Sequence, residues 1–254
     1  MKLFYKGLVI GKKHKAGRNR NGRICVRRRQ GGCDVLYRKV NFNLSFTSKD
    51  NYQLVRSEYD PNRSSFIGLL YNYKDQKFTY ILLPEGLAIN ELILNSFENS
   101  FKRKPGFRSY LDYFPLGSLV HNISLSNLGH GLLCRSRGSF AKILQKNVKN
   151  KYIRIRLPSG EERLVHKFCK ATLGTVANIK KSIKKKNAGW ARRMGNRPSV
   201  RGVAMNPVDH PHGGGEGRTS GGRCSVSPWG KLTIGKPTVS KKKKKMIIQF
   251  RKQV

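Results

Sequence analysis

Two histidines and two carboxylates lie close together toward the C-terminal end of the sequence. They are Asp209, His210, His212 and Glu216. Imidazole and carboxylate groups at this spacing can ligate a metal ion or carry out acid–base catalysis. No nucleophile with an orienting base and no phosphate-binding loop elsewhere in the sequence completes a known catalytic pattern. The sequence therefore predicts neither a catalytic residue nor a metal site, and an enzyme that uses this cluster is the first alternative.

The cluster lies in a segment, Arg197–Gly230, that shows neither helical nor strand periodicity. Glycine and proline are frequent in it, so we expect no packed core that could hold catalytic groups in place. Consecutive glycines carry no side chains, so another backbone can come very close to them. Prolines reduce the conformational entropy that is lost when the segment is fixed in one shape. The segment carries Arg197, Arg201, Arg218 and Arg223. Such a backbone is expected to thread between crowded phosphates, with a disordered tail as the alternative.

Charge is the strongest feature of the composition. The 254 residues include 53 Lys and Arg against 13 Asp and Glu, which gives a net charge of +40. The excess lies toward the two ends: 11 basic residues precede the first acid, Asp34, and 23 follow Glu162 against only two acids. A chain of this charge repels itself unless a polyanion neutralises it, so a nucleic acid is the expected partner.

An anionic membrane surface is the alternative polyanion. No apolar run in the sequence approaches the roughly 20 residues of a membrane span. Only Val176–Arg193 resembles a basic amphipathic helix that could lie on a membrane surface. We therefore expect no membrane association.

Five cysteines are scattered along the chain without the spacing of a metal-binding or redox pair. An odd, scattered set indicates free thiols in a reducing compartment rather than a disulfide framework. Cys25 and Cys33 could face each other across a hairpin. A metal site there would need two more ligands, and His14 is the only histidine nearby.

Short apolar segments separated by turn residues predict two small β-barrels. Strands of the first are expected in Ile24–Phe46, as a hairpin about Gly31–Gly32, and in Gln53–Arg63, Phe66–Tyr73 and Lys77–Leu83. The sequence Asp60–Pro61–Asn62 predicts a tight turn with side-chain hydrogen bonds. Phe66, Tyr71 and Tyr73 are assigned to the core, with base stacking as the alternative.

Segment Asn90–Tyr113 is predicted to connect the barrels, with helical character over Asn90–Phe101 and a basic loop over Lys102–Arg108. Strands of the second barrel are expected in Leu116–Ile123, Gly138–Leu144, Tyr152–Leu157 and Arg163–Cys169. His121 lies in a strand pattern and is expected to be a hydrogen-bonded core or edge residue. A short basic helix is predicted within Val176–Gly195, and the Lys241–Lys245 run is expected to stay disordered unless bound.

Several short segments of this sequence resemble segments of a single protein family. AMNPVDHPHGGGEGR at Ala204–Arg218 resembles the signature of the universal large-subunit ribosomal protein family L-two. Further similarity lies in GRNRNGRI at Gly17–Ile24, EYDPNRS at Glu58–Ser64, YILLPEGL at Tyr80–Leu87 and KATLGTVAN at Lys170–Asn178. The resemblance extends over nearly the whole chain from Gly17 to Gly230.

The resemblance implies a mainly β fold. An OB-fold would be followed by a barrel of the Src-homology-three-like translation-protein type, with long irregular basic extensions at both ends. The expected domains are a basic arm at 1–16, the OB-fold at 17–114, the second barrel with its short basic helix at 115–196, and an rRNA-threading extension with a Lys-rich tail at 197–254.

The resemblance also implies a structural constituent of the large ribosomal subunit that is not an enzyme. It would bind large-subunit rRNA near the peptidyl transferase centre and support assembly, subunit association and tRNA binding. The expected partners are rRNA, neighbouring ribosomal proteins, the small subunit across an intersubunit bridge, and tRNA nearby. No cofactor is expected beyond magnesium associated with rRNA, and a free-standing RNA-binding factor is the second alternative.

The residues expected to bind rRNA are basic or lie in the glycine-rich segment. They are Lys12, Lys13, Lys15, Arg18, Arg20, Arg23, Arg27, Arg28, Arg63, Arg192, Arg193, Arg197, Arg201, Asn206, His210, His212, Gly213, Gly214, Gly215, Arg218, Arg223 and Trp229.

Composition bears on the compartment. The sequence is rich in Lys, Asn, Ile, Phe and Tyr, a bias typical of an AT-rich genome such as an organellar one. A mitochondrial ribosome is therefore favoured, with the bacterial cytoplasm or a plastid as alternatives.

The basic N-terminal region is interpreted as an RNA-binding arm rather than as a transit peptide, since the family resemblance begins by Gly17. The Lys241–Lys245 run is interpreted as part of the tail rather than as a nuclear localisation signal.

Overall fold

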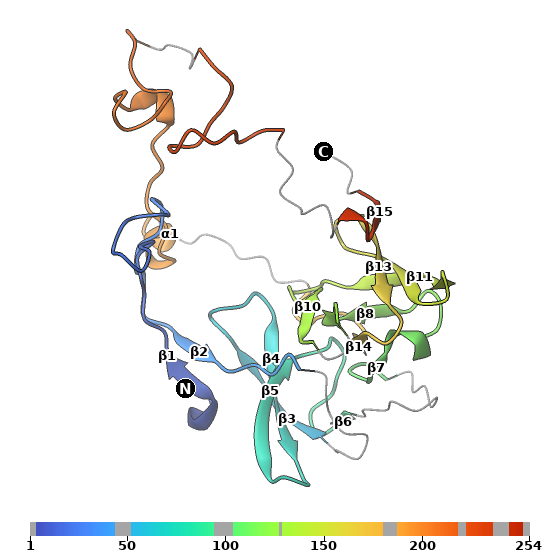
Figure 1. Cartoon of the computed structure of the whole chain (residues 1–254). Coiled ribbons are helices and arrows are strands. Elements are labelled where there is room, and N and C mark those ends of the chain that lie inside the picture. Colours follow the sequence, from blue (N-terminus) through green and yellow to red (C-terminus); the bar gives the residue numbers. More distant parts are fainter. Residues whose placement is uncertain are drawn as a thin grey trace. The chain divides into compact units, whose positions relative to one another are not determined.

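A computed structural model describes residues 4–43, 52–93, 104–126, 129–179, 187–217, 222–235 and 244–250. The chain forms two compact units (Figure 1). Unit 1 comprises Met1–Lys12, Val35–Ile183 and Lys245–Val254, and unit 2 comprises Lys13–Asp34 and Lys184–Lys244. The prediction of a mainly β chain is confirmed, since strands far outnumber helices. Arg218, Lys241–Lys243 and residues 94–101 of the predicted helical segment lie outside the described residues.

The first sheet of unit 1 has four antiparallel strands in the order β5-β4-β3-β6. Its strands are β3 (Tyr52–Tyr59), β4 (Phe66–Asn72), β5 (Lys77–Leu82) and β6 (Leu92–Ile93). Leu54, Leu70 and Ile81 pack together on one face, as the alternation of apolar residues predicts. The helical prediction for Asn90–Phe101 is wrong where the structure describes it, because Leu92–Ile93 pairs with β3 and buries Ile93 in this core.

The N-terminal residues add a small ribbon to the first sheet. Helix η1 (Lys6–Leu8) leads into β1 (Val9–Gly11), which pairs with β2 (Leu36–Arg38). Leu8 and Val9 pack against a core cluster that includes Tyr80, whose hydroxyl accepts a hydrogen bond from the Tyr5 backbone N–H at 2.8 Å. This part of the predicted basic arm therefore has a folded role.

The predicted hairpin over Ile24–Phe46 is wrong in its first strand, whereas the second contains β2, and residues 44–46 lie outside the described residues. Strand β2 takes β1 as its partner, and residues 24–30 form a turn and two isolated β-bridges, at Ile24 and Arg29, instead of a strand. Ile24 is 52% exposed and Val26 is also exposed, so alternation in this stretch buries no apolar face. Cys25 and Cys33, expected across the hairpin from each other, are both exposed free thiols.

The turn between β3 and β4 forms as predicted. Asp60 is fully buried, and its Oδ1 accepts the Asn62 backbone N–H at 2.8 Å. Its Oδ2 forms an ion pair with the guanidinium of Arg63. Of the three aromatic residues assigned to the core, Phe66 and Tyr71 are half-buried, whereas Tyr73 is exposed because it lies at the end of the β4–β5 hairpin.

The second sheet of unit 1 has the order β15-β13-β12-β11-β8-β14-β7. Its strands are β7 (Arg108–Tyr110), β8 (Leu119–His121), β11 (Ala141–Val148), β12 (Tyr152–Arg156), β13 (Glu162–His166), β14 (Lys170–Leu173) and β15 (Ile247–Gln249). Helix η2 (Leu111–Tyr113) follows β7, and a two-stranded sheet pairs β9 (Ile123–Ser124) with β10 (Gly131–Leu133). Phe107, Phe114 and Ile153 belong to the single core cluster beneath these strands.

Two strands of the second sheet come from segments expected to lie outside it. Strand β7, from the predicted connection between barrels, pairs with β14. Strand β15, from the predicted tail, pairs with β13. Both pairings join residues far apart in the sequence, which local patterning does not reveal.

The second sheet also contains a buried carboxylate. Glu162 is 1% exposed, and its two oxygens accept hydrogen bonds from the guanidinium groups of Arg154 and Arg156. The hydrogen bonds from Arg156 and Arg154 hold the pKa of Glu162 below its usual value. Strands β12 and β13 are thus joined by an ion-pair network as well as by their backbone ladder.

His121 is a buried, hydrogen-bonded core residue, as the sequence predicts. It is 1% exposed, and its Nδ1 lies 2.9 Å from the Gly174 carbonyl oxygen, which fixes Nδ1 as the donor. Burial lowers the pKa of His121 to about 4. The second sheet therefore forms around a neutral imidazole.

In the described part of the chain, no helix is long and apolar enough to cross a membrane.

This environment predicts a pH-dependent stability. Between pH 6.5 and 4 the unfolded chain binds a proton at His121 while the folded chain does not, so the free energy of unfolding falls as the pH falls. The loss is about 3 kcal/mol for a pKa lowered to about 4. In His121→Asn the amide keeps the hydrogen bond to Gly174 and does not titrate. Urea unfolding of both full-length chains at several pH values should show a flatter profile for the variant. Parallel profiles would contradict the assignment.

Candidate nucleic-acid interface

Unit 2 joins the N-terminal arm to the C-terminal extension. The backbone N–H of Gln30 donates to the Gly195 carbonyl at 2.8 Å, that of Cys33 to Arg193 at 2.9 Å, and that of Arg197 to Arg28 at 2.8 Å. These bonds place Arg27–Arg29 beside Arg192–Arg197, which the sequence separates by more than 160 residues. Helix α1 (Trp190–Arg193) provides this second strip. In the described part of the predicted basic helix, only Trp190–Arg193 is helical, and residues 180–186 lie outside the described residues.

The cations of this unit are exposed. Every predicted site arginine and lysine in the described part of unit 2 is exposed, namely Lys13, Lys15, Arg18, Arg20, Arg23, Arg27, Arg28, Arg192, Arg193, Arg197, Arg201 and Arg223. In the described residues no carboxylate lies within ion-pairing distance of any of these arginines. Their charge is therefore available to a polyanion.

The two histidines of the glycine-rich segment accept hydrogen bonds from the backbone. His210 is 8% exposed, and its Nδ1 accepts the His212 backbone N–H at 3.1 Å. The Nε2 of His212 accepts the Val226 backbone N–H at 3.3 Å. Burial lowers the pKa of His210, and the neighbouring His212 and Arg27 lower it further. Both rings therefore act as hydrogen-bond acceptors that shape the loop.

The glycines of this segment permit close contacts within the loop itself. A Cβ on Gly213 would lie 2.3 Å from the Asn206 carbonyl oxygen, and one on Gly202 would lie 2.5 Å from the His210 ring. Gly214 has φ of +89° and Gly215 has φ of +91°. Helix η3 (Gly202–Ala204) is thereby held close to His210. The bare backbone that the sequence predicts is used first to fold the loop on itself.

The other predicted residues are distributed as follows. Lys12, Asn206, Gly215 and Trp229 are exposed, His212, Gly213 and Gly214 are half-buried, and Arg218 lies outside the described residues. Arg63 is half-buried in unit 1, where it contacts Asp60 and Tyr37. The structure thus brings most of the predicted set into unit 2 and leaves Lys12 and Arg63 in unit 1.

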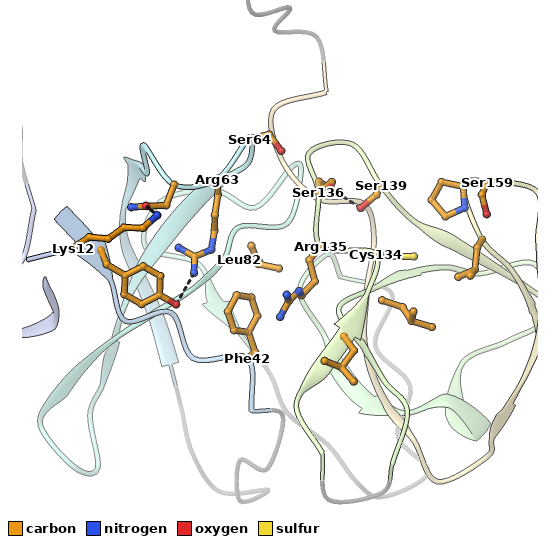
Figure 2. Close-up of a pocket in the computed structure, with 16 residues that line it drawn as sticks. Lys12, Phe42, Arg63, Ser64, Leu82, Cys134, Arg135, Ser136, Ser139 and Ser159 are labelled. Carbon is orange, nitrogen blue, oxygen red and sulfur yellow. Dashed lines mark hydrogen bonds between the residues drawn. The ribbon is translucent and has the colours of Figure 1, made fainter. Parts of the chain in front are cut away.

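Unit 1 contains a second cationic site, a hollow of about 1070 Å³. Figure 2 shows Arg63 and Arg135 directed toward Phe42 from two sides. The Arg63 guanidinium lies 5.4 Å from the centre of the Phe42 ring and that of Arg135 lies 4.3 Å from it. Lys12 also lines the hollow and donates to Asn62 Oδ1 at 3.0 Å.

Each arginine of this hollow is oriented by the protein. Asp60 forms an ion pair with Arg63, and Arg135 Nη1 donates to the Gly131 carbonyl at 3.2 Å. Fixed guanidinium groups beside an aromatic ring can contact a phosphate and a base together. The hollow therefore offers a polar, cationic site of the kind that RNA occupies.

Arg135 and Phe42 line this hollow but are not among the residues that the sequence predicts to bind RNA. Arg135 lies after β10, in a short basic stretch that also contains Arg137, and this charge was the only available signal. Phe42 follows β2 and belongs to a strand pattern that predicts core packing. Only the fold brings both next to Arg63.

The described residues contain no group of three or more His, Cys, Asp or Glu side chains arranged to hold a metal ion. Asp209 and Glu216, which lie near the two histidines in the sequence, are exposed. The histidine nitrogens that could have ligated a metal accept backbone hydrogen bonds instead.

Two family models match this chain. Residues 5–95 match Ribosomal Proteins L2, RNA binding N-terminal domain, and residues 104–230 match Ribosomal Proteins L2, C-terminal domain. The two matches account for the first sheet, for the second sheet except β15, and for the whole glycine-rich segment.

Full-length relatives agree with these matches. The chain is 45% identical over 236 residues to the large ribosomal subunit protein uL2 of Anaplasma marginale (strain Florida), covering 92% of this chain and 82% of the relative. It is 46% identical to uL2 of Nitrobacter hamburgensis, covering 93% and 84%. It is 44% identical to uL2m of Reclinomonas americana, covering 98% and 88%.

The packing of Gly213 predicts the effect of a substitution. In Gly213→Ala the new methyl group meets the Asn206 carbonyl, which accepts the backbone N–H groups of Asp209 and His210 at 3.0 and 3.2 Å. A displacement costing about 1.4 kcal/mol would speed hydrogen exchange of these two amides about tenfold. Gly189→Ala is the matched control because nothing lies within 4 Å of its added Cβ. Equal exchange in the two variants would show that the contact does not hold the loop.

Proposed function

This chain belongs to the ribosomal protein L2 family, and we propose that it is a structural component of the large ribosomal subunit that binds large-subunit rRNA. Proteins of this family are structural rather than catalytic, so the chain is not an enzyme. The observation that carries the proposal is the set of exposed arginines in unit 2 that have no carboxylate partner among the described residues. Phosphates of folded rRNA neutralise such a set.

The binding free energy comes mainly from charge. Each phosphate that a Lys or Arg neutralises releases condensed counterions, so affinity falls steeply with salt. Arginine also binds phosphate through two parallel hydrogen bonds and stacks on bases. Because the major groove of helical RNA is too narrow and deep for side chains to read, the contacts are made to backbone shape and 2′-hydroxyl groups rather than to sequence.

The two cationic sites have different roles in this proposal. The hollow between Arg63 and Arg135 sits on rigid sheets of unit 1 and holds one RNA strand in a fixed register. The paired strips at Arg27–Arg29 and Arg192–Arg197 in unit 2 contact the more crowded rRNA interior. The loop shaped by His210 and Gly213 presents its backbone to that rRNA. His212 has no catalytic role in this proposal, and its Nε2 shapes the loop by accepting a backbone hydrogen bond.

We place the extension over 197–230 near the peptidyl transferase centre, where it supports assembly, subunit association and tRNA binding. The partners are rRNA, neighbouring ribosomal proteins, the small subunit across a bridge, and tRNA nearby. Magnesium enters only as an ion associated with rRNA. The specific string at Ala204–Arg218 and the irregular, hydrogen-bonded loop that contains it support this placement.

We further propose that the ribosome is mitochondrial. The richness in Lys, Asn, Ile, Phe and Tyr supports this compartment, as does the extensive similarity to the uL2m protein of Reclinomonas americana. Bacterial relatives are equally similar, so a bacterial cytoplasm or a plastid is the alternative.

Sedimentation tests the central proposal. Extract from fractionated organelles and cytoplasm is run on a sucrose gradient at high magnesium, and the chain is detected by antibody. Migration with the large subunit that survives moderate salt supports the proposal, and the fraction of origin identifies the compartment. A chain found mainly at the top of the gradient would contradict it and would support a free RNA-binding factor.

The hollow yields a more specific prediction. Arg135→Ala removes one phosphate contact and is expected to weaken binding of the full-length chain to large-subunit rRNA about tenfold. The slope of log K against log salt should fall by roughly 0.7 to 0.9. Lys74→Ala, at the exposed β4–β5 turn, serves as the control and should leave both quantities nearly unchanged. Filter binding between 50 and 300 mM salt (about the range in which such slopes are linear) measures them. Indistinguishable losses in the two variants would mean that the hollow is not an RNA site.

A further inference from the structure

Five aromatic rings form a continuous stripe on the second sheet, which we call the aromatic stripe. It runs from Tyr113 through Tyr110, Phe168 and His166 to Tyr152. Successive ring centres lie 5.9, 6.0, 5.5 and 5.9 Å apart. Phe168 is 46% exposed and the other four rings are half-buried. An apolar stripe of this length that stays accessible to solvent is typical of an interaction surface.

A hollow of about 540 Å³ lies at one end of the stripe. Tyr152 and His166, the last two rings, line it together with Leu125, Leu164 and Met246. Aliphatic, methionine and aromatic walls are the surroundings in which a buried side chain of a binding partner contributes most to affinity. The stripe and hollow together thus have the composition of the centre of a protein–protein interface.

Most of the cations near the stripe already have partners within the chain. The ammonium group of Lys167 lies 5.3 Å from the Phe168 ring centre, and that of Lys170 lies 5.9 Å from the Tyr110 ring centre. Lys146 donates to the Asp112 carbonyl, and Arg154 is paired with Glu162. This differs from unit 2, whose arginines have no carboxylate partner among the described residues. Three of the four ring pairs are T-shaped, so the stripe offers no flat platform for consecutive bases.

From these contacts we propose that the aromatic stripe and its hollow are the docking site of another protein of the same particle rather than of rRNA. The partner inserts an apolar side chain into the hollow and covers Phe168. The inference rests on the proposed function only in placing the chain in a large ribosomal subunit. It assigns a protein partner to a face that the RNA-binding proposal does not use.

The charge at the edge of the hollow specifies the partner further. Arg163 lines the hollow, and its buried Nε has no hydrogen-bond partner among the described residues. Lys151, next to Tyr152, is exposed. A partner segment that places Asp or Glu a few residues from its apolar anchor pairs with both cations. The expected occupant is therefore an acidic segment with one large apolar residue.

Site-specific photocrosslinking in assembled particles tests the inference. The full-length chain carries p-benzoylphenylalanine in place of Phe168, is incorporated into large subunits in cells, and is irradiated after the subunits are purified. Mass spectrometry of the products should show a link to another protein at an apolar residue with Asp or Glu within a few positions. The same probe in place of Leu116, which is exposed in the same unit, should not give that product.

Each other outcome has a defined meaning. Products with rRNA, products only with this chain itself, or no product at position 168 overturn the inference. A probe in place of Trp229, in unit 2, serves as the positive control for photochemistry and should link to rRNA. Absence of the chain from large subunits counts against the proposed function. A chain that is present and linked to rRNA through position 229, but to no protein through position 168, counts against this inference alone.

Substitution provides a second measurement. Phe168→Ser removes the exposed ring and should lower occupancy of the linked protein in purified subunits about tenfold, because truncation of a central aromatic anchor commonly has this effect. Leu116→Ser removes an exposed apolar side chain that belongs to neither the stripe nor its hollow and should leave occupancy unchanged. The amount of this chain per subunit is measured in parallel to exclude misfolding. Equal occupancy in both variants would overturn the inference.

Discussion

Electrostatic repulsion within a chain of net charge +40 is the constraint on which the rest of the structure depends. Only 13 acidic residues oppose 53 basic ones, and the fold places several of the acids where they orient arginines. Asp60 holds Arg63, Glu58 holds Arg56, and Glu162 is held between Arg154 and Arg156. These carboxylates are buried in unit 1. The buried acids are therefore paired with arginines of their own unit, and the arginines of unit 2 are left for a polyanion.

Unit 2 shows how an irregular segment acquires a defined shape without a large apolar core. Close backbone contacts, rather than burial of apolar side chains, define the loop. Gly213 and Gly202 allow the backbone to approach Asn206 and His210 at distances that any side chain would prevent. Backbone hydrogen bonds to the two imidazoles then fix the loop in one conformation. The imidazole rings act here as acceptors, which satisfies two backbone N–H groups without a packed core.

Unit 1 takes strands from segments near both ends of the chain. Strand β1 pairs with β2 beside the first sheet, and β15 pairs with β13 in the second. Such pairings enclose long stretches of chain, and their closure entropy is offset by backbone hydrogen bonds and by apolar contacts such as those of Leu8 and Val9. They leave the aromatic stripe accessible, with its hollow bounded by Met246 just before β15. The two hollows of unit 1 thus differ in chemistry, one lined by the cations Arg63 and Arg135, the other bordered by aromatic rings.

The sequence by itself determined the β class, the tight turn at Asp60, the buried role of His121 and the family, because alternation, turn chemistry and a specific string are local properties. It also indicated exposed arginines through composition alone. Tertiary structure decided which distant segments pair, and so it replaced the hairpin expected about Gly31–Gly32 with the pairing of β1 and β2. It alone brought Arg135 to Phe42 and Arg197 to Arg28. The physical reason is that such contacts depend on burial and hydrogen bonding across long loops, which no local pattern encodes.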